Sequence, residues 1–452
     1  MGLSNIEKNS IGFTLLNIWV RFWHNIFFYK KFTVLGKDNI LKDKALIFTP
    51  NHQNALMDAL ALLFSMDKIL VFVARSDIFK KPAVARILYF LKILPIYRVR
   101  DGFDTIKKNK EIILKTVDIL TSGNAMVILP EGNHSGLRRL RPLKKGFARM
   151  AFQAEEANDF KLDIHIVPVG IDYDNYQNYK SSPIVIFGEP IPVKEYIDLY
   201  KENPAVAINN IKDRLTDHIK PLIVDIESED NYDLYNELRV IYRTQMAETL
   251  KVDSKDIKNR VLIDQHTIKH VADYEKANPD GLIGYQDTIL KFVELRDKLG
   301  FTNSIIEQKG LCFMKMFFNS IALLATLPVF LFGYINNILA YWLPITFSKK
   351  IKDPQFQSSF KFVISLLSFP IFYIIQCITI LLVFNDWEVV LAYLISLPIS
   401  GAIALRWFSI FTKTRLGFKY MFNRLRKNKD FINMEKIYND IIIRANGIVN
   451  QQ

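Results

Sequence analysis

The segment ALIFTPNHQNALMDALALLF (residues 45–64) contains the pattern that decides the fold. Its first four residues are a short apolar run, which predicts a buried β-strand, and its last six predict a helix after a turn. His52 therefore lies at a strand-to-helix turn, with the carboxylate of Asp58 a short way down the chain. An α/β enzyme places a general base and the acid that orients it at such a turn. A surface-loop histidine beside a helix explains the same pattern, so other features must decide.

Similar apolar runs alternate with helical patterns through the first half of the chain. We expect strands at 32–36, 44–49, 69–74, 94–98, 125–129, 164–169 and 183–187. We expect helices at 55–66, 82–91, 103–121, 144–157 and 205–225. Strands that alternate with helices in this way form βαβ units. The sequence therefore predicts an α/β fold with a mainly parallel sheet flanked by helices.

Polar residues follow three of the expected strands. Asn51-His52, Arg98 and the segment 131–135 each lie at the end of a strand. In parallel sheets a ligand site forms at the carboxyl ends of the strands, so we expect these residues to share one edge.

A dense basic run follows the third polar cluster. It has five cations within eight residues and no acidic residue among them: Arg138, Arg139, Arg141, Lys144 and Lys145. Arginine binds phosphate through a planar fork of charge-assisted hydrogen bonds. A glutamate beside a flexible glycine near these cations suits an acceptor that carries both hydroxyl groups and a phosphate. A basic surface patch resting on anionic lipid is the alternative interpretation.

The composition divides the chain into a soluble part and a membrane part. Half of the 452 residues are hydrophobic, and the apolar excess is concentrated after residue 310. Residues 316–348, 362–385 and 389–405 are charge-free apolar runs, which predict membrane helices. The net charge of +13 indicates an anionic partner, and the apolar segments favour an anionic lipid surface over nucleic acid.

The basic residues around the last two apolar runs indicate the topology. Both flanks are basic and the segment between them, 385–388, is short and acidic, so the positive-inside rule predicts a hairpin that starts and ends in the cytoplasm. The run at 316–348 would be ~50 Å long as one helix. We expect a second hairpin there, broken near Pro328, Gly333 or 336–337. The catalytic domain would then lie on the cytoplasmic face of the membrane.

Four motifs in order resemble the glycerolipid acyltransferase family, whose members acylate glycerol 3-phosphate and lysophosphatidate. The resemblance covers about residues 30–200. Its motifs are Asn51-His52 to Asp58, Leu94-Pro95-Ile96-Tyr97-Arg98, Leu129-Pro130-Glu131-Gly132 and Val167-Pro168-Val169-Gly170. The family resemblance implies the glycerolipid acyltransferase fold, followed by a helical connector and a C-terminal transmembrane region.

Two departures from the common family pattern narrow the resemblance. Five residues separate His52 from Asp58, where the common pattern has four. The third motif continues as Asn133-His134-Ser135 instead of Thr-Arg-Ser, so one phosphate-binding arginine is absent. Both features resemble the fungal-type branch that acylates glycerol 3-phosphate or dihydroxyacetone phosphate and carries C-terminal membrane helices.

The resemblance implies direct acyl transfer, without an acyl-enzyme, in phosphatidic acid and phospholipid biosynthesis. His52 would remove the proton of the acceptor hydroxyl as that hydroxyl attacks an acyl thioester, and Asp58 would fix the imidazole tautomer. The donor would be acyl-CoA or acyl carrier protein. We expect no metal and no cofactor besides this donor substrate, because the histidines are scattered and the two cysteines lie in or beside apolar segments.

The resemblance also implies the substrate-binding residues. Glu131 would position the glycerol hydroxyls, and backbone amides around Gly132 would stabilise the oxyanion. Arg98, together with one or two cations of the basic run, would hold the phosphate. The expected substrate-binding set is Arg98, Glu131, Gly132, Asn133, His134, Arg138, Arg139 and Lys145.

On this basis we divide the chain into five segments. They are an amphipathic membrane-interface helix (1–30), the acyltransferase domain (31–225), a helical connector (226–310), transmembrane helices in two hairpins (311–412) and a basic cytoplasmic tail (413–452). Two alternatives stay open. The acceptor could be lysophosphatidate or another lysolipid, and the chain could be a non-catalytic membrane scaffold, which would require His52 and Asp58 to point apart.

Overall fold

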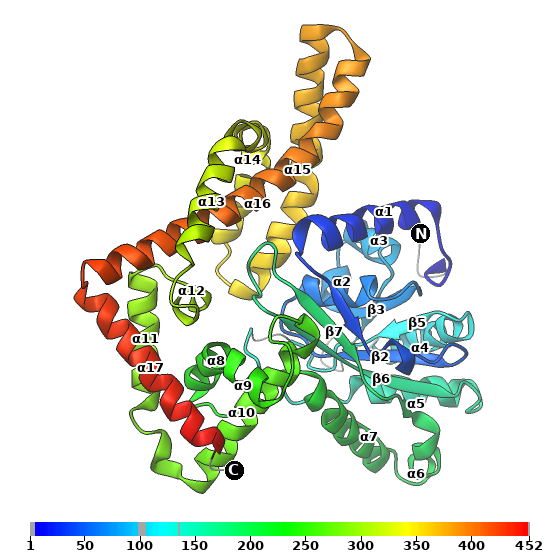
Figure 1. Cartoon of the computed structure of the whole chain (residues 1–452). Coiled ribbons are helices and arrows are strands. Elements are labelled where there is room, and N and C mark those ends of the chain that lie inside the picture. Colours follow the sequence, from blue (N-terminus) through cyan, green and yellow to red (C-terminus); the bar gives the residue numbers. More distant parts are fainter. Residues whose placement is uncertain (1–4, 98–104, 134–135, 451–452) are drawn as a thin grey trace. The chain divides into compact units, whose positions relative to one another are not determined.

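The computed structural model describes residues 5–97, 105–133 and 136–450. The chain divides into two compact units, and we describe each by itself (Figure 1). The first unit comprises Met1–Asp225 together with Ile351–Ser359, and the second comprises Ile226–Lys350 and Phe360–Gln452.

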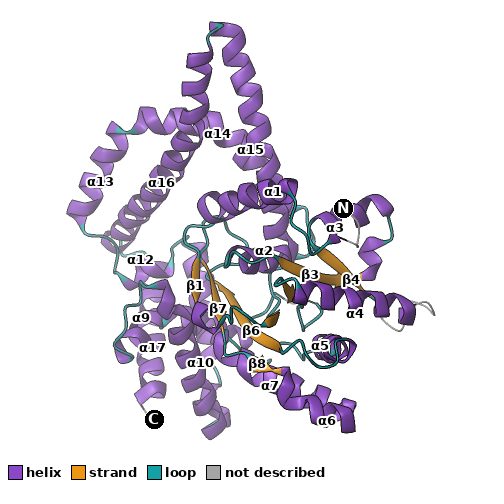
Figure 2. Cartoon of the chain, turned by 90° about the vertical axis from the view of Figure 1, so that its right-hand side faces the viewer, coloured by secondary structure: helices purple, strands orange, loops and turns teal. Residues whose placement is uncertain are grey.

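An eight-stranded sheet forms the centre of the first unit (Figure 2). Its strands are β1 (Thr33–Leu35), β2 (Ala45–Pro50), β3 (Leu70–Arg75), β4 (Ile93–Ile96), β5 (Ala125–Val127), β6 (Ile164–Tyr173), β7 (Pro183–Phe187) and β8 (Ile191–Pro192). The strand order is β1-β7-β6-β2-β5-β3-β4, and β8 pairs with β6. The pairs among β6, β2, β5, β3 and β4 are parallel, whereas β6 pairs antiparallel with β7 and β8. This mainly parallel sheet confirms the predicted fold class.

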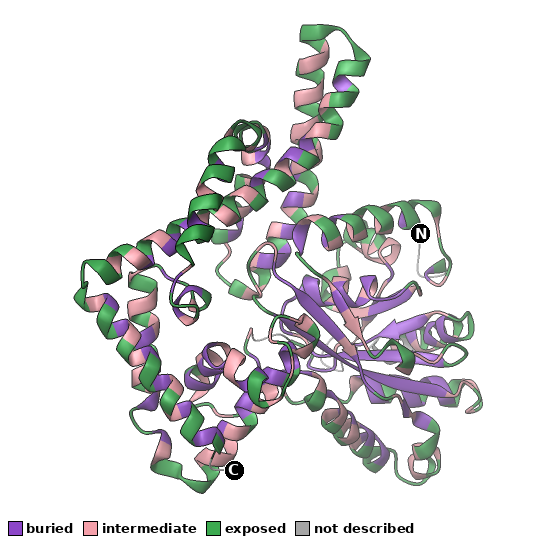
Figure 3. Cartoon of the chain, in the orientation of Figure 1, coloured by how far each residue is buried: buried purple, intermediate pink, exposed green. Residues whose placement is uncertain are grey.

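Strand β2 lies in the middle of the sheet, and helices cover both of its faces. All six of its residues are buried, as Figure 3 shows for most of the sheet. Ala45 and Ile47 belong to a core cluster that includes residues of the helices α4, α5 and α7. Phe48 points to the opposite face, where its ring packs edge-on against Phe187 of β7 at 5.7 Å. An apolar run buried on both faces therefore folds as an interior parallel strand.

Seven α-helices accompany the sheet in the described part of the first unit. They are α1 (Ile11–Phe22), α2 (Leu56–Phe64), α3 (Pro82–Phe90), α4 (Thr105–Thr121), α5 (Gly146–Ala157), α6 (Ile197–Glu202) and α7 (Pro204–Ile219). The expected strands and helices agree with these elements to within a few residues, apart from the C-terminal end of the expected helix at 205–225 and the unpredicted β8 and α6.

The second unit is helical. Its helices are α8 (Tyr232–Ile241), α9 (Arg243–Thr249), α10 (Arg260–Ala277), α11 (Tyr285–Lys298), α12 (Asn303–Glu307), α13 (Phe313–Ala325), α14 (Leu327–Lys349), α15 (Pro354–Phe384, from Phe360 onward), α16 (Trp387–Leu425) and α17 (Lys429–Asn450). Within the described residues, α14, α15 and α16 are long and apolar enough to cross a membrane, by length and composition. These helices fit the prediction of a membrane protein.

Side-chain hydrogen bonds join the three apolar helices. Asn337 of α14 donates to the carbonyl of Leu397 in α16 at 3.2 Å and accepts from the hydroxyl of Tyr373 in α15 at 2.6 Å. Tyr393 of α16 likewise donates to Asn336 at 2.6 Å. Polar residues between apolar helices stabilise their packing in this way.

The breaks between the apolar helices follow local sequence. Asn385 has a φ of 48° and Asp386 caps α16, so α15 and α16 meet at a short turn where a hairpin is expected. In the run 316–348 the chain breaks at Thr326, beside Pro328. Helix α14 continues through Gly333 and residues 336–337. Of the three expected break positions, the helix is therefore interrupted only near Pro328.

Candidate active site

A histidine and an aspartate meet at the carboxyl end of β2. His52 lies in the turn between β2 and α2, and Asp58 lies in the first turn of α2. Nδ1 of His52 is 3.0 Å from Oδ2 of Asp58. Ala55, directly before α2, has a φ of 44°, a conformation that L-residues rarely adopt. The five-residue spacer is therefore accommodated in the turn, and both side chains reach the same place.

The carboxylate of Asp58 is buried and accepts four hydrogen bonds. Its side chain is 1% exposed. Besides His52, its Oδ2 accepts from the backbone N–H groups of Gln53 at 2.8 Å and Asn54 at 2.7 Å. Its Oδ1 accepts from the hydroxyl of Tyr173 at 3.0 Å. A buried negative charge is tolerated because several donors stabilise it.

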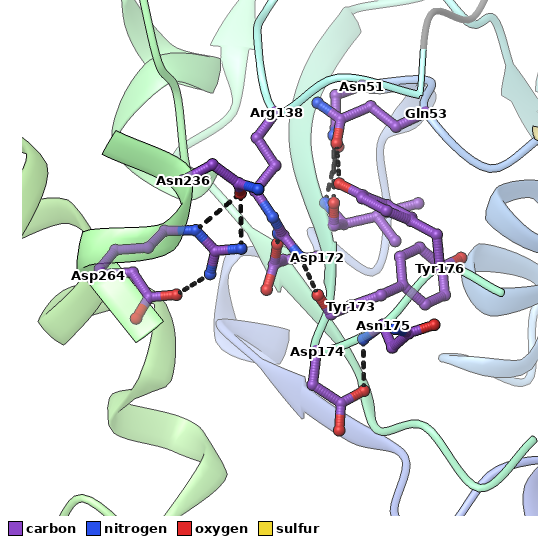
Figure 4. Close-up of polar contacts among 12 residues, drawn as sticks. Asn51, Gln53, Arg138, Asp172, Tyr173, Asp174, Asn175, Tyr176, Asn236 and Asp264 are labelled. Atoms are coloured by element: carbon purple, nitrogen blue, oxygen red, sulfur yellow. Dashed lines mark hydrogen bonds and ion pairs between the residues drawn. The ribbon is translucent and has the colours of Figure 1, made fainter. Parts of the chain in front are cut away.

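Asn51 fixes the start of this turn to the neighbouring strand β6. Its side-chain amide donates to the carbonyl of Ile171 at 3.1 Å and accepts from the N–H of the same residue at 2.7 Å. The side chain of Gln53 accepts from the hydroxyl of Tyr176 (Figure 4). These contacts hold the turn to the segment that begins at the end of β6, and hence hold His52 in place.

Glu131 follows β5, the other strand that flanks β2. Its Oε1 accepts from the backbone N–H of His52 at 2.7 Å, and its Oε2 from the N–H of Arg141 at 3.3 Å. Burial, opposed by these two hydrogen bonds, raises the pKa of Glu131 to about 8. The glutamate thus joins the His52 turn to the basic segment, and it carries a proton at neutral pH.

The turn after Glu131 lies beside the start of α5. Gly132 has a φ of 67°, and its N–H donates to the carbonyl of Leu129 at 3.2 Å. The N–H of Lys144 donates to the carbonyl of Pro130 at 2.7 Å. Lys144 and Lys145 are exposed, so the structure brings two solvent-accessible cations next to the Glu131 turn.

Arg138 is the buried member of the basic run. Its guanidinium forms an ion pair with Asp172 and donates to the carbonyl of Tyr173, and its side chain is 4% exposed (Figure 4). The same group lies 4.9 Å from the ring centroid of Tyr176. These contacts favour a structural role for Arg138, which ties the basic segment to the end of β6.

The structure describes only some of the other predicted substrate-binding residues. Arg98 and His134 lie outside the described residues. Asn133 is exposed and Arg139 is half-exposed. The backbone of Tyr97, directly before Arg98, exchanges two hydrogen bonds with the side chain of Asn109, at 3.3 and 3.1 Å. The roles proposed for these residues remain predictions.

The described residues contain no cluster of three His, Cys, Asp or Glu side chains that could hold a metal ion. The expectation of a reaction without metal or cofactor remains a prediction.

Part of the first unit is similar to a known family. Residues 31–172 match the sequence model of the family described as Acyltransferase. The chain contains an acyltransferase-family domain. His52, Asp58 and Glu131 all lie within the matched residues.

Two yeast proteins are similar to this chain. Glycerol-3-phosphate O-acyltransferase 2 of Saccharomyces cerevisiae is 25% identical over 210 residues, which cover 44% of this chain and 28% of that protein. Glycerol-3-phosphate O-acyltransferase 1 of the same organism is 26% identical over 134 residues, which cover 29% of this chain and 18% of that protein. The alignments thus span less than a third of each relative's length.

A solved structure also matches. It is the 1-acyl-sn-glycerophosphate acyltransferase PlsC from Thermotoga maritima, at 21% identity and a TM-score of 0.29, over 47% of this chain and 78% of that chain.

Tyr173 contacts this site, although no sequence motif indicates that it does. It lies three residues after the Val-Pro-Val-Gly motif, at the end of the strand beside β2. If the strand that ends at Tyr173 is paired in parallel with β2, its end is expected to lie next to the histidine turn. The direction of its hydroxyl could not be predicted, because 115 residues separate it from Asp58.

Proposed function

We propose that this protein is a membrane-bound O-acyltransferase that moves a fatty acyl group from an acyl thioester to a hydroxyl of glycerol 3-phosphate or dihydroxyacetone phosphate. The observation that carries the proposal is the hydrogen bond between His52 and Asp58 at the carboxyl end of the central strand. A base oriented by a buried carboxylate at this edge of the sheet suits proton removal from a hydroxyl. The same hydrogen bond argues against a non-catalytic scaffold, which would require the two side chains to point apart.

The proposed reaction needs one base and no covalent enzyme intermediate. Asp58 accepts from Nδ1 of His52, so Nε2 is the atom that we assign to the acceptor hydroxyl. As Nε2 takes the proton, the hydroxyl oxygen attacks the thioester carbonyl and forms a tetrahedral oxyanion. The carbon–sulfur bond then breaks, and the leaving thiolate takes the proton from the imidazolium, so an ester and a thiol are released. Asp58 stabilises the imidazolium between the two proton transfers.

The charges beside the site suit an acceptor that carries a phosphate. Lys144 and Lys145 are exposed next to the Glu131 turn, and Arg139 is half-exposed in the same segment. Arg98, which lies outside the described residues, would add a further cation. We assign the phosphate to these cations rather than to Arg138, whose guanidinium already binds Asp172.

The acceptor assignment also draws on the relatives, both of which are named as glycerol-3-phosphate O-acyltransferases. Lysophosphatidate or another lysolipid is the alternative, because a lysolipid acceptor would use the same base and, where it carries a phosphate, the same cations. We propose acyl-CoA or acyl carrier protein as the donor, and no cofactor.

The exposed side chains of α1 support a position at a membrane surface. Ile11, Leu15 and Ile18 are 83%, 63% and 59% exposed, and Trp19 is also exposed on this helix. An apolar stripe of this kind lies in a membrane interface, where anionic lipids attract a basic protein. We propose that the catalytic domain works on the cytoplasmic face, as expected from the basic flanks of the membrane helices.

Acceptor profiling tests this function. Purified full-length protein in lipid nanodiscs would be given radiolabelled acyl-CoA or acyl carrier protein with each acceptor separately: glycerol 3-phosphate, dihydroxyacetone phosphate and lysophosphatidate. We expect the highest kcat/KM with glycerol 3-phosphate or dihydroxyacetone phosphate. A preference for lysophosphatidate would overturn the acceptor assignment, and the absence of acyl transfer to all three would overturn the proposed function.

A further inference from the structure

The buried carboxylate of Asp58 has a side-chain donor on the face opposite His52. The hydroxyl of Tyr173 donates to Oδ1 at 3.0 Å, while His52 and two backbone N–H groups contact Oδ2. Tyr173 is completely buried, and it is the last residue of β6. The three side chains therefore form a chain of hydrogen bonds that runs from the interior of the domain to the partly exposed histidine.

Tyr173 can act only as a donor in this chain. Burial first, and then the negative charge of Asp58, raise the pKa of Tyr173 well above its ordinary range. The hydroxyl therefore keeps its proton at neutral pH and donates it to Oδ1 of Asp58. The bond holds Oδ1 in place and leaves Oδ2 directed at the imidazole.

The tyrosine is itself held rigidly from several sides. Its carbonyl accepts from the guanidinium of Arg138. Its ring centroid lies 6.1 Å from that of Tyr29 and 5.5 Å from that of Tyr176. Packing of this kind fixes the rotamer of a residue that orients another group. The ion pair of Arg138 with Asp172, the preceding residue, fixes the same strand end.

We propose that Tyr173 is a positioning residue for acyl transfer, which acts through Asp58 to set both the orientation and the basicity of His52. This inference rests on the proposed function for its kinetic consequence, but its effect on His52 exists in the absence of any substrate. The physical basis is that Tyr173 and His52 both hydrogen-bond to the same carboxylate, that of Asp58. A donor to Oδ1 withdraws charge from the carboxylate, so Asp58 stabilises the imidazolium less than it would without the tyrosine.

The test is Tyr173→Phe in full-length protein, which removes one oxygen atom and keeps the ring. The titration of each of the seven histidines would be followed by mass spectrometry of hydrogen–deuterium exchange at imidazole Cε1, which needs no turnover. The groups near Asp58 and Tyr173 that also titrate or carry charge are His52, Glu131, Arg138, Asp172, Asp174, Tyr29 and Tyr176. We therefore compare the pH midpoint of the titration of His52 alone between variant and wild type. We expect it to rise by about half a unit or more, while the midpoints of the other six histidines stay unchanged.

The matched control is Tyr235→Phe in α8 of the second unit. Tyr235 donates to Oε2 of Glu275 at 2.5 Å, so its substitution also removes a tyrosine–carboxylate hydrogen bond. We expect no change in the titration of His52 in this variant. An unchanged His52 midpoint in Tyr173→Phe, or an equal shift in Tyr235→Phe, would overturn the inference.

Kinetics separate this inference from the proposed function. In the acyl-transfer assay, Tyr173→Phe should lower kcat about tenfold with little change in the acceptor KM, as removal of a supporting hydrogen bond does elsewhere. His52→Ala is assayed in parallel. Turnover that survives in His52→Ala would contradict the proposed function, whereas the titration of His52 in Tyr173→Phe would still decide the role of the tyrosine.

Discussion

Oδ2 of Asp58 lies 3.0 Å from Nδ1 of His52, although five residues separate the two in the chain. The aspartate is in the first turn of α2, whereas the histidine lies before the helix begins. The turn brings them together because Ala55 adopts a positive φ and because the N–H groups of Gln53 and Asn54 bind the same carboxylate oxygen. The spacer length is therefore part of the site and is not an interruption of it.

The first prediction concerns the charge of Asp58. In Asp58→Asn, an amide N–H₂ can face Nδ1 and favour the wrong imidazole tautomer, so kcat should fall by about 10³- to 10⁴-fold. The measurement is steady-state acyl transfer by purified protein. The control is Asp77→Asn, an exposed aspartate that pairs with Arg75 on the surface, which should leave kcat unchanged. A kcat for Asp58→Asn close to wild type would show that this aspartate does not orient the base.

The second prediction concerns the pH dependence of stability. The ordinary pKa of Glu131 is 4.5, and burial raises it to about 8 in the folded protein. Between these values the unfolded chain releases a proton that the folded chain keeps, so the free energy of unfolding falls as pH rises from about 4.5 to about 8. The Tm of Glu131→Gln should therefore decrease less than that of wild type between pH 5 and pH 8.

The matched control for Glu131 is Glu189→Gln, because Glu189 is exposed. Its Tm should follow the wild-type pH dependence. Parallel Tm curves for Glu131→Gln and wild type would show that Glu131 is ionised in the fold over this range.

The third prediction distinguishes a structural arginine from a substrate-binding one. Arg138→Met removes one partner of a buried ion pair whose side chains are both 4% exposed. The uncompensated charge of Asp172 should lower the free energy of unfolding by about 3–5 kcal/mol, measured by chemical unfolding of the purified protein. Arg214→Met is the control, because its ion pair with Glu195 is partly exposed and should contribute about 1 kcal/mol or less. Equal stability of the two variants would contradict the structural role of Arg138.

The fourth prediction concerns the phosphate of the acceptor. Lys145 is exposed beside the Glu131 turn, and its removal should not unfold the domain. Lys145→Ala should raise the KM for glycerol 3-phosphate about tenfold, since a hydrogen bond to a charged group is lost, with kcat nearly unchanged. Lys161→Ala, which removes another exposed lysine on the surface, is the matched control. An unchanged acceptor KM in Lys145→Ala would remove this lysine from the phosphate site.

Most of the sheet, and the histidine and aspartate at its centre, could be predicted from the sequence. The short apolar run 45–48, followed by a turn, predicts a buried strand that presents His52 at its carboxyl end. Glu131 was predicted at the same edge because parallel neighbours end together. The structure places its carboxylate on the backbone of His52, a contact that no local pattern encodes.

Other features depend on contacts between residues far apart in the chain. The basic run has the composition of a phosphate site, but burial decides which cations remain accessible, and Arg138 is buried against Asp172. Tyr173 belongs to a strand whose period-2 pattern gives its face and not the partner of its hydroxyl. Helix α14 continues through Gly333 because the glycine lets α16 pack closely there, although a glycine in an apolar run also predicts a break.

We propose His52 as the base for acyl transfer, and comparing wild type with His52→Ala tests this role. Both proteins would be purified in the same lipid nanodiscs and given radiolabelled glycerol 3-phosphate and acyl-CoA or acyl carrier protein. Incorporation and Tm would be measured on the same samples. If His52 is the base, wild type forms the acylated product, and His52→Ala, with an unchanged Tm, forms at least about 10³-fold less. Product formation by folded His52→Ala at the wild-type rate would contradict this role.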